Sequence, residues 1–298
     1  MKHSLSIIIP VFKNLRGLKA VISDLRQSNI PIAYEIIVCN DGANRFISDW
    51  LTDQGIKEIS IGKKQGSYFA RNRGIEASMG NWLLFVDADV EVFPNWFQHI
   101  EAQLDTYDYF AFNVKVKTNS KDALFKRYSV YKEFQTKQFF EERHFGVTAF
   151  ILVKKSLIQT IGAFEQRVMS GGDLEFGMRT HSAGFKQYFQ EQHFVSHKPR
   201  TLFQKFKKQI RANKGQLKLS LLGKIELYDK YSLINAFLMP FKTIWRIYST
   251  VQKREKRHFN RSEIFIAECA EYSIVLFAFW LVLLLKPYYF FKLKDEKK

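Results

Sequence analysis

The stretch LLFVDADVEV, Leu83 to Val92, begins as an apolar run and then presents two aspartates, Asp87 and Asp89, separated by one alanine. An unbroken apolar run is typical of a strand buried on both faces of a parallel sheet. Side chains two positions apart on a strand point to one side, so both carboxylates should face one crevice. A hard divalent cation between them would offset their repulsion, and the plainer alternative is a surface turn.

Two earlier apolar runs, LSIIIPVF (5–12) and YEIIVCND (34–41), also end in polar or turn residues. Between them, apolar residues recur at helical spacing from Leu15 to Leu25, and the segment 57–80 suggests a short strand followed by a helix. Strands that alternate with helices predict an α/β fold with a mostly parallel sheet covered on both faces. In such sheets ligands bind at the carboxyl ends of the strands, where all three runs turn polar.

The chain has 298 residues and a net charge of +17, and this charge is unevenly placed. Residues 1–197 carry 24 Lys and Arg against 21 Asp and Glu, whereas residues 198–298 carry 22 against 8. The basic last third also holds the most apolar run, Ser273 to Leu285. Lipid-facing residues beside Lys and Arg favour an anionic membrane surface as partner and argue against nucleic acid.

The last third reads as three helical segments. A basic amphipathic helix is expected from Arg200, and an apolar helix from Leu233 should be broken by Pro240. The apolar run from Tyr272 to Phe291 is interrupted by Lys286 and Pro287, which leaves it short for a spanning helix. We expect helices lying in the membrane interface; a single span and a hydrophobic soluble subdomain are the alternatives.

Cysteine use and the start of the chain suggest a cytoplasmic location. Cys39 and Cys269 cannot form a disulfide framework, which favours a reducing compartment. The start, MKHSLSIIIPVF, has a short apolar run without a small-residue cleavage site, so we interpret it as a first strand. The expected location is the cytoplasmic face of the cell membrane.

Five ordered blocks resemble one enzyme family: IIIPVFKN, IIVCNDGA, ARNRGIEASMGNWLLFVDAD, SGGDLEFGMR and VSH. Together, from Ser4 to His197, they resemble the family-2 glycosyltransferases, which have the GT-A fold. The resemblance implies a nucleotide-sugar-binding half at 1–115, an acceptor-side half with the catalytic base at 116–200, and an appendage at 201–298. A Q-x-x-R-W motif of the long-chain synthases is absent, which argues for a non-processive enzyme.

In this family the loop after the first strand and an aspartate after the second hold the nucleoside. The matching residues are Pro10, Val11, Phe12 and Asp41. Phe12 stands in place of a usual tyrosine, and Asn40 in place of a usual aspartate, so the base is left open; Asn40-Asp41-Gly42 is also an ordinary turn sequence.

The resemblance also assigns the ARNRG block to the donor diphosphate. Arg71 and Asn72 match a segment that approaches the nucleotide, and a guanidinium can donate to two phosphate oxygens at once. The alternative for Arg71 is a solvated charge on a helix.

The family's D-x-D motif corresponds to Asp87, Ala88 and Asp89. Asp87 and Ala88 would lie at the nucleotide-sugar, and Asp89 would bind the metal together with His197. The expected cofactor is Mn²⁺ or Mg²⁺. Histidine is a better ligand for Mn²⁺ than for Mg²⁺. The alternative for His197 is a packed ring.

The block SGGDLEFGMR corresponds to the catalytic base segment, with Asp173 as the base and Arg179 six residues later. Gly172 stands where the family commonly has an acidic residue. An aspartate at a helix start can also be a simple N-cap. Glu175 is a second candidate base, although an ion pair with Arg179 at i,i+4 is the plainer interpretation.

These residues imply an inverting, metal-dependent transfer of one sugar from a nucleoside-diphosphate sugar, with uridine as the family-level expectation. The acceptor would be a glycan or a lipid-linked glycan in cell-surface polysaccharide synthesis. The alternatives are a nucleotidyltransferase with the same fold and an inactive membrane-bound scaffold.

Overall fold

The three apolar runs form neighbouring parallel strands in one sheet. β1 (Ser4–Val11) lies between β2 (Ala33–Asp41) and β4 (Trp82–Val86), and Ile8 is in register with both Ile37 and Phe85. β4 is buried throughout and β1 nearly so, as the apolar sequences predict.

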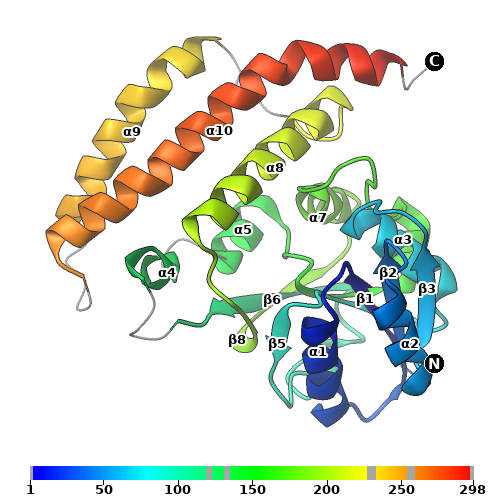
Figure 1. Ribbon diagram of the computed structural model, residues 1–298. Helices are drawn as coiled ribbons and strands as arrows, with labels where there is room; N and C mark the ends of the chain where they lie inside the picture. Colours follow the sequence, from blue (N-terminus) through cyan, green and yellow to red (C-terminus); the bar gives the residue numbers. More distant parts are fainter. Residues whose placement is uncertain (1–2, 119–122, 131–134, 227–232, 254–258, 296–298) are drawn as a thin grey trace. The chain divides into compact units, whose positions relative to one another are not determined.

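The structure is a computed structural model that describes residues 3–118, 123–130, 135–226, 233–253 and 259–295 (Figure 1). It divides into two units: Met1–Lys117 with Phe134–Lys198, here the sheet unit, and Thr118–Glu133 with Pro199–Lys298, here the helical unit.

The sheet unit contains a mixed sheet of eight strands in the order β3-β2-β1-β4-β7-β6-β8-β5. The pairs among β1 to β4 are parallel, β7 is antiparallel to both its neighbours, and β5 is antiparallel to β8. The other strands are β3 (Lys57–Ile61), β5 (Val90–Val92), β6 (Tyr109–Val116), β7 (Phe150–Lys154) and β8 (Gln187–His197).

Helices cover both faces of this sheet, as expected. The predicted first helix, α1 (Leu15–Gln27), buries Leu18 and Val21 in the same core as Ile7. α3 (Ser67–Ala77) packs on the opposite face, over Ile8. The other helices of the unit are α2 (Arg45–Asp53), α5 (Thr136–Arg143), α6 (Lys155–Ile161), α7 (Gly172–Ser182) and a 3₁₀ turn at Glu101–Gln103.

The helical unit contains α4 (Leu124–Ser129), α8 (Leu202–Leu221), α9 (Leu233–Lys253) and α10 (Arg261–Asp295). α10 packs against both α8 and α9, and the three run side by side (Figure 1). α8 is the expected basic amphipathic helix and begins with a capping box at Thr201.

The expected helix break at Pro240 was wrong. α9 continues through Pro240, and α10 continues through Pro287. A proline inside a helix removes one hydrogen bond and crowds the preceding turn. Packing offsets this cost in α10, because Val282 before Pro287 and Tyr289 after it belong to the same apolar cluster.

Candidate active site

The carboxyl ends of β1, β2 and β4 lie at one edge of the sheet, because the three strands are parallel neighbours. Asn14 ties two of these ends together. Its side-chain amide donates to the carbonyl of Ala88 at 3.2 Å, while its Oδ1 caps α1 by accepting from the Gly17 N–H. A Cβ at Gly17 would lie 2.2 Å from that carbonyl, so only glycine permits the contact. The D-x-D segment is therefore held against the loop after β1.

Asp41, at the end of β2, accepts two backbone hydrogen bonds from the loop before α3. The N–H groups of Gln65 and Gly66 donate to its two carboxylate oxygens at 2.7 and 2.8 Å. Each oxygen retains lone-pair capacity, so the carboxylate can still accept from a ligand. Asp41 thus joins the end of β2 to the loop that leads into α3.

Asn40 has a purely internal set of partners. It is fully buried, and its amide donates to the Asn44 carbonyl, to Ser48 and, at 2.9 Å, to a carboxylate oxygen of Glu58. Its Oδ1 accepts from the Asn44 N–H. An aspartate here would place a second carboxylate against Glu58, so the asparagine has a structural reason that is independent of the ligand.

Of the three candidate nucleoside residues on and after β1, Pro10 and Val11 are buried in the strand and only Phe12 is exposed. The ammonium of Lys64 lies 4.4 Å from the centre of the Phe12 ring. An exposed aromatic ring flanked by a cation is suited to a flat, anionic ligand such as a nucleotide.

Arg71 and Asp87 form an ion pair beneath the edge. The Arg71 side chain, on α3, is only 2% exposed, whereas that of Asp87 is 34% exposed. The guanidinium Nη2 donates to Asp87 Oδ1 and to the Thr148 carbonyl. Nε and Nη1 of Arg71 have no hydrogen-bond partner among the described residues, which is unusual for buried N–H groups.

Asp87 lies in an environment that disfavours its charge. Burial raises the pKa of the Asp87 carboxyl, Arg71 opposes this shift, and the neighbouring Asp89 and Asp173 add to it. A cation bound at the edge would stabilise the ionised form.

Asp89 and His197 face each other across the β5–β8 pair. Val90 is in register with His197, and His197 Nε2 lies 3.3 Å from Asp89 Oδ2. The ring nitrogen Nδ1 lies 2.6 Å from the carbonyl of Lys198, which makes Nδ1 a donor and leaves Nε2 as the ring nitrogen that faces Asp89. An imidazole oriented by a backbone carbonyl, beside a half-exposed carboxylate, fits a divalent metal.

The described residues at this edge supply few ligands for a metal ion. No group of three or more His, Cys, Asp or Glu that could hold a metal occurs within the described ranges. Two protein ligands are nevertheless compatible with Mg²⁺ or Mn²⁺ when phosphate oxygens and water complete the shell.

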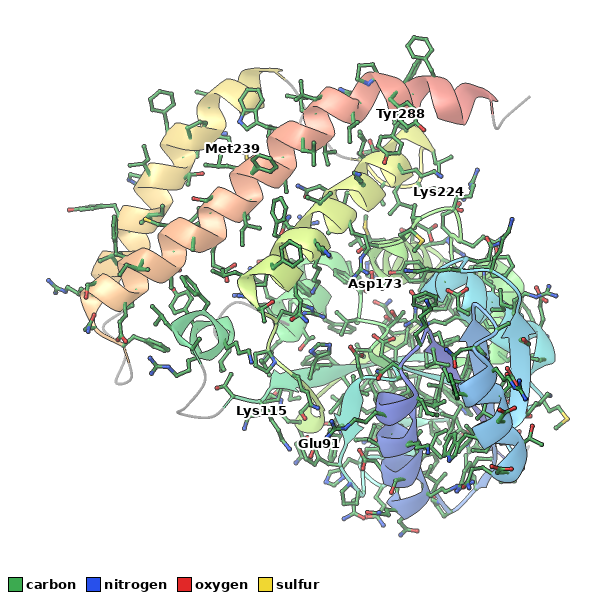
Figure 2. The ribbon with its side chains drawn as sticks, in the orientation of Figure 1. Glu91, Lys115, Asp173, Lys224, Met239 and Tyr288 are labelled. Atoms are coloured by element: carbon green, nitrogen blue, oxygen red, sulfur yellow. The ribbon has the colours of Figure 1, made fainter. Side chains whose placement is uncertain are left out.

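Asp173 lies at the start of α7 and is half-buried (Figure 2). Its Oδ1 accepts from the Tyr68 hydroxyl at 3.1 Å and from the Leu174 N–H at 3.0 Å. Its Oδ2 has no hydrogen bond in the part of the chain that the structure describes. Sequence reasoning did not single out Tyr68, although its position one helical turn before Arg71 places it on the same side of α3.

Glu175 forms the ion pair with Arg179 that the i,i+4 spacing indicated. Glu175 is buried, and its two oxygens accept from Nε and Nη2 of Arg179 at 2.8 Å each. Arg179 also donates to the carbonyls of Ile161, Gly162 and Ala163. Both residues therefore clamp the turn after α6.

Asn72 points elsewhere than its neighbour Arg71. Its amide donates to the Phe164 carbonyl at 2.9 Å, and its Oδ1 accepts from the Phe164 N–H. The structure thus brings Arg71 together with Asp87, and Asp89 together with His197. Asn72 instead joins α3 to the segment before α7.

The fold is that of the GT-A glycosyltransferases. A mannosyltransferase from Pyrobaculum calidifontis, PcManGT, solved in complex with GDP-Man and Mn²⁺, aligns with a TM-score of 0.60 at 11% identity over 95% of this chain and 88% of that one. Residues 1–349 of TarS from Staphylococcus aureus align with a TM-score of 0.55 at 14% identity, over 93% and 90% of the two chains.

The chain belongs to glycosyl transferase family 2, whose sequence profile matches residues 6–162. It is also 28% identical over 244 residues to the glycosyltransferase AglE of Haloferax volcanii, covering 79% of this chain and 80% of that one. The predicted family and fold class are confirmed, and the protein is a glycosyltransferase.

Proposed function

We propose that the protein is an inverting enzyme that moves one sugar from a nucleoside-diphosphate sugar, with UDP as the expected nucleotide, to a glycan or lipid-linked acceptor in cell-surface polysaccharide synthesis. One observation supports this proposal: Asp89 and His197 face each other at 3.3 Å, and both of them, together with Asp173, act electrostatically on Asp87. Asp173 is close enough to Asp87, the first aspartate of the D-x-D, to influence its pKa.

Asp173 is the proposed general base. Its Oδ2 takes the proton from an acceptor hydroxyl while that oxygen forms a bond to the anomeric carbon of the donor sugar. The bond from the anomeric carbon to the diphosphate oxygen breaks, and the nucleoside diphosphate leaves with the electron pair. A single displacement of this kind inverts the anomeric configuration, and it requires donor and acceptor to be held in line.

The metal site consists of Asp89 and His197. Mn²⁺ or Mg²⁺ held there would supply positive charge to the departing diphosphate. A histidine ligand at position 197 favours Mn²⁺ of the two. Asp87 and Ala88 would lie at the nucleotide-sugar, with the buried Arg71 supplying a fixed positive charge behind Asp87.

The nucleoside would lie at the ends of β1 and β2. Phe12 offers its exposed ring, and the Asp41 carboxylate keeps acceptor capacity for an N–H of the base. A base without an N–H in the matching position would leave this carboxylate unpaired, and this cost discriminates strongly between bases. Pro10 and Val11 shape the floor of this subsite, and Asn72 acts through the position of α3.

The helical unit supports binding to an anionic membrane surface. α9 exposes an apolar stripe, and so does α10; the exposed residues are Leu238, Phe241, Ile244, Trp245 and Tyr248 on α9 and Phe277, Trp280, Leu284, Tyr288 and Phe291 on α10. Figure 2 shows the side chains of these helices, with Met239 and Tyr288 marked. Aromatic stripes next to a basic helix suit the headgroup region of a bilayer.

Lying in the interface explains α10 better than crossing the membrane. The segment Arg261–Phe291 is long and apolar enough to span by composition. However, Glu268 is fully buried and bonded to Tyr128, and Glu271 pairs with Lys205 of α8. The uninterrupted apolar part after them covers roughly 20 Å, against about 30 Å of hydrocarbon.

The decisive enzymatic test is nucleoside-diphosphate release from UDP-, GDP- and dTDP-sugars, with Mn²⁺, Mg²⁺ or EDTA. We expect one donor to turn over with metal, and Asp89→Ala and Asp173→Asn to lose turnover. Asp49→Asn, an exposed aspartate on α2, is the matched control and should retain turnover. The anomeric configuration of the product, read by NMR coupling constants, should be opposite to that of the donor.

Other outcomes would replace the proposal. Release of pyrophosphate would indicate a nucleotidyltransferase, and retention of configuration would remove Asp173 as base of a single displacement. Failure of every donor to turn over or to bind would indicate a scaffold.

Membrane binding is tested by co-sedimentation with phosphatidylcholine vesicles, with and without phosphatidylglycerol. We expect binding to require the anionic lipid and to fall when Trp245 and Trp280 are changed to Glu. Phe46→Glu alters an exposed aromatic residue of the sheet unit, and this variant should bind normally. Membrane-expressed protein that resists alkaline extraction would instead indicate a span.

A further inference from the structure

Tyr68 and Asp173 form a reciprocal pair between α3 and α7. The Tyr68 hydroxyl donates to Asp173 Oδ1 at 3.1 Å, and its oxygen accepts from the Asp173 N–H at 3.2 Å. Together with the Leu174 N–H, the hydroxyl occupies one carboxylate oxygen and leaves the other without a partner among the described residues. The carboxylate is thus held at a fixed rotation.

Gly172 makes this pair possible. A Cβ at Gly172 would lie 2.9 Å from the Cε2 and Cζ atoms of the Tyr68 ring. The ring occupies the space that a side chain at the preceding position would need. The contact between Tyr68 and Asp173 therefore depends on a glycine at position 172.

Tyr68 is a persistent hydrogen-bond donor. Its ring is buried and packs against Phe164. Burial, reinforced by the charge of Asp173, raises the pKa of the Tyr68 phenol, so the hydroxyl keeps its proton throughout the physiological range.

We infer that Tyr68 is a positioning residue for the general base: its hydroxyl holds Asp173 Oδ1 so that Oδ2 faces the acceptor. This inference rests on the proposed role of Asp173. One helical turn further along α3, Arg71 donates to Asp87. The helix α3 therefore positions two carboxylates: Asp87, which lies at the donor, and Asp173, which deprotonates the acceptor.

The test uses Tyr68→Phe, which keeps the ring and removes only the hydroxyl. We expect kcat to fall about 10- to 100-fold, the range for a hydrogen bond to a charged group, while the KM for the donor is unchanged. The acidic limb of the kcat profile should move to higher pH, because the hydroxyl favours the carboxylate over the carboxylic acid. Asp87 and Tyr109, which also interact electrostatically with Asp173, are unaltered in this variant.

The matched control is Tyr188→Phe, a half-buried tyrosine that packs against Phe110 in the same unit. It should keep kcat and the pH profile of the wild type. Thermal unfolding of both variants separates a positioning effect from a loss of structure.

Two further variants make the outcome decisive. Gly172→Ala should displace the Tyr68 ring and reproduce the kcat loss of Tyr68→Phe. The double variant of Tyr68→Phe and Gly172→Ala should lose no more kcat than either single variant, because both changes remove the same contact.

Failure of the inference and failure of the proposed base give different results. If Asp173→Asn abolishes transfer but Tyr68→Phe keeps a normal kcat and pH profile, the positioning role is wrong and the base stands. If Asp173→Asn retains transfer, the base assignment is wrong. An equal loss of kcat and thermal stability in Tyr68→Phe, without a shift of the pH profile, would reduce Tyr68 to a structural role.

Discussion

His197 Nε2 lies 3.3 Å from Asp89 Oδ2 because the register of the β5–β8 pair places Val90 opposite His197. The two residues are far apart in the sequence, and an antiparallel ladder holds them at a fixed separation. The Lys198 carbonyl orients the imidazole from the other side. The imidazole is therefore held from both sides, by the Asp89 carboxylate and by a backbone carbonyl.

The first prediction concerns metal affinity. His197→Ala should raise the dissociation constant for Mn²⁺, in the presence of nucleoside diphosphate, by about 10-fold or more. The free Mn²⁺ signal in electron paramagnetic resonance measures this without relying on turnover. His193→Ala changes an exposed histidine on the same strand and should leave the affinity unchanged. Equal affinities for wild type and His197→Ala would remove the histidine from the metal site.

The second prediction concerns the pH dependence of stability in EDTA. Burial raises the pKa of Asp87 in the folded state, so its contribution to stability is complete below the unfolded-state pKa, about 4. That contribution is lost as the pH rises through the folded-state pKa. The free energy of unfolding of the wild type should therefore fall relative to Asp87→Asn from about pH 4 upward.

Denaturant unfolding at several pH values measures this difference. Added Mn²⁺ and nucleoside diphosphate should reverse the trend in the wild type, because a bound cation favours the carboxylate. A difference that grows in favour of the wild type with pH would contradict the stated environment of Asp87.

The third prediction concerns Asn40, which stands where the family usually has an aspartate. Asn40→Asp should lower the free energy of unfolding by about 3 kcal/mol at neutral pH, because it places an unpaired buried charge against Glu58. Adding Glu58→Gln should recover at least half of this loss by supplying a donor. Urea unfolding of the two single variants and the double variant measures the coupling. Full stability of Asn40→Asp alone would show that the position tolerates the usual aspartate.

The sequence was informative where apolar periodicity determined the structure. The runs before Asn14, Gly42 and Asp87 predicted parallel strands, and their shared polar edge located the candidate site. Periodicity could not predict contacts between side chains from distant segments. Tyr68 beside Asp173 and Glu58 beside Asn40 depend on how helices and strands pack, and single residues in the sequence carry no mark of these partners.

The wrong expectation at Pro240 has a similar cause. Pro240 and Pro287 carry a strong local signal to end a helix. Tertiary packing on both sides of Pro287 overrides that signal, and local sequence rules do not include such packing.

The last prediction separates the two acidic residues at the start of α7. Glu175→Gln breaks a buried ion pair with Arg179 and should lower the free energy of unfolding by about 3 kcal/mol, while kcat of the folded enzyme at low temperature stays within a few-fold of the wild type. Asp173→Asn should do the reverse, with near-normal unfolding and no transfer. Unfolding curves and single-turnover transfer, measured on the same preparations, give both quantities. Loss of transfer at unchanged stability in Glu175→Gln would make Glu175 the base, because a residue needed only to clamp the turn after α6 cannot abolish transfer while leaving the fold intact.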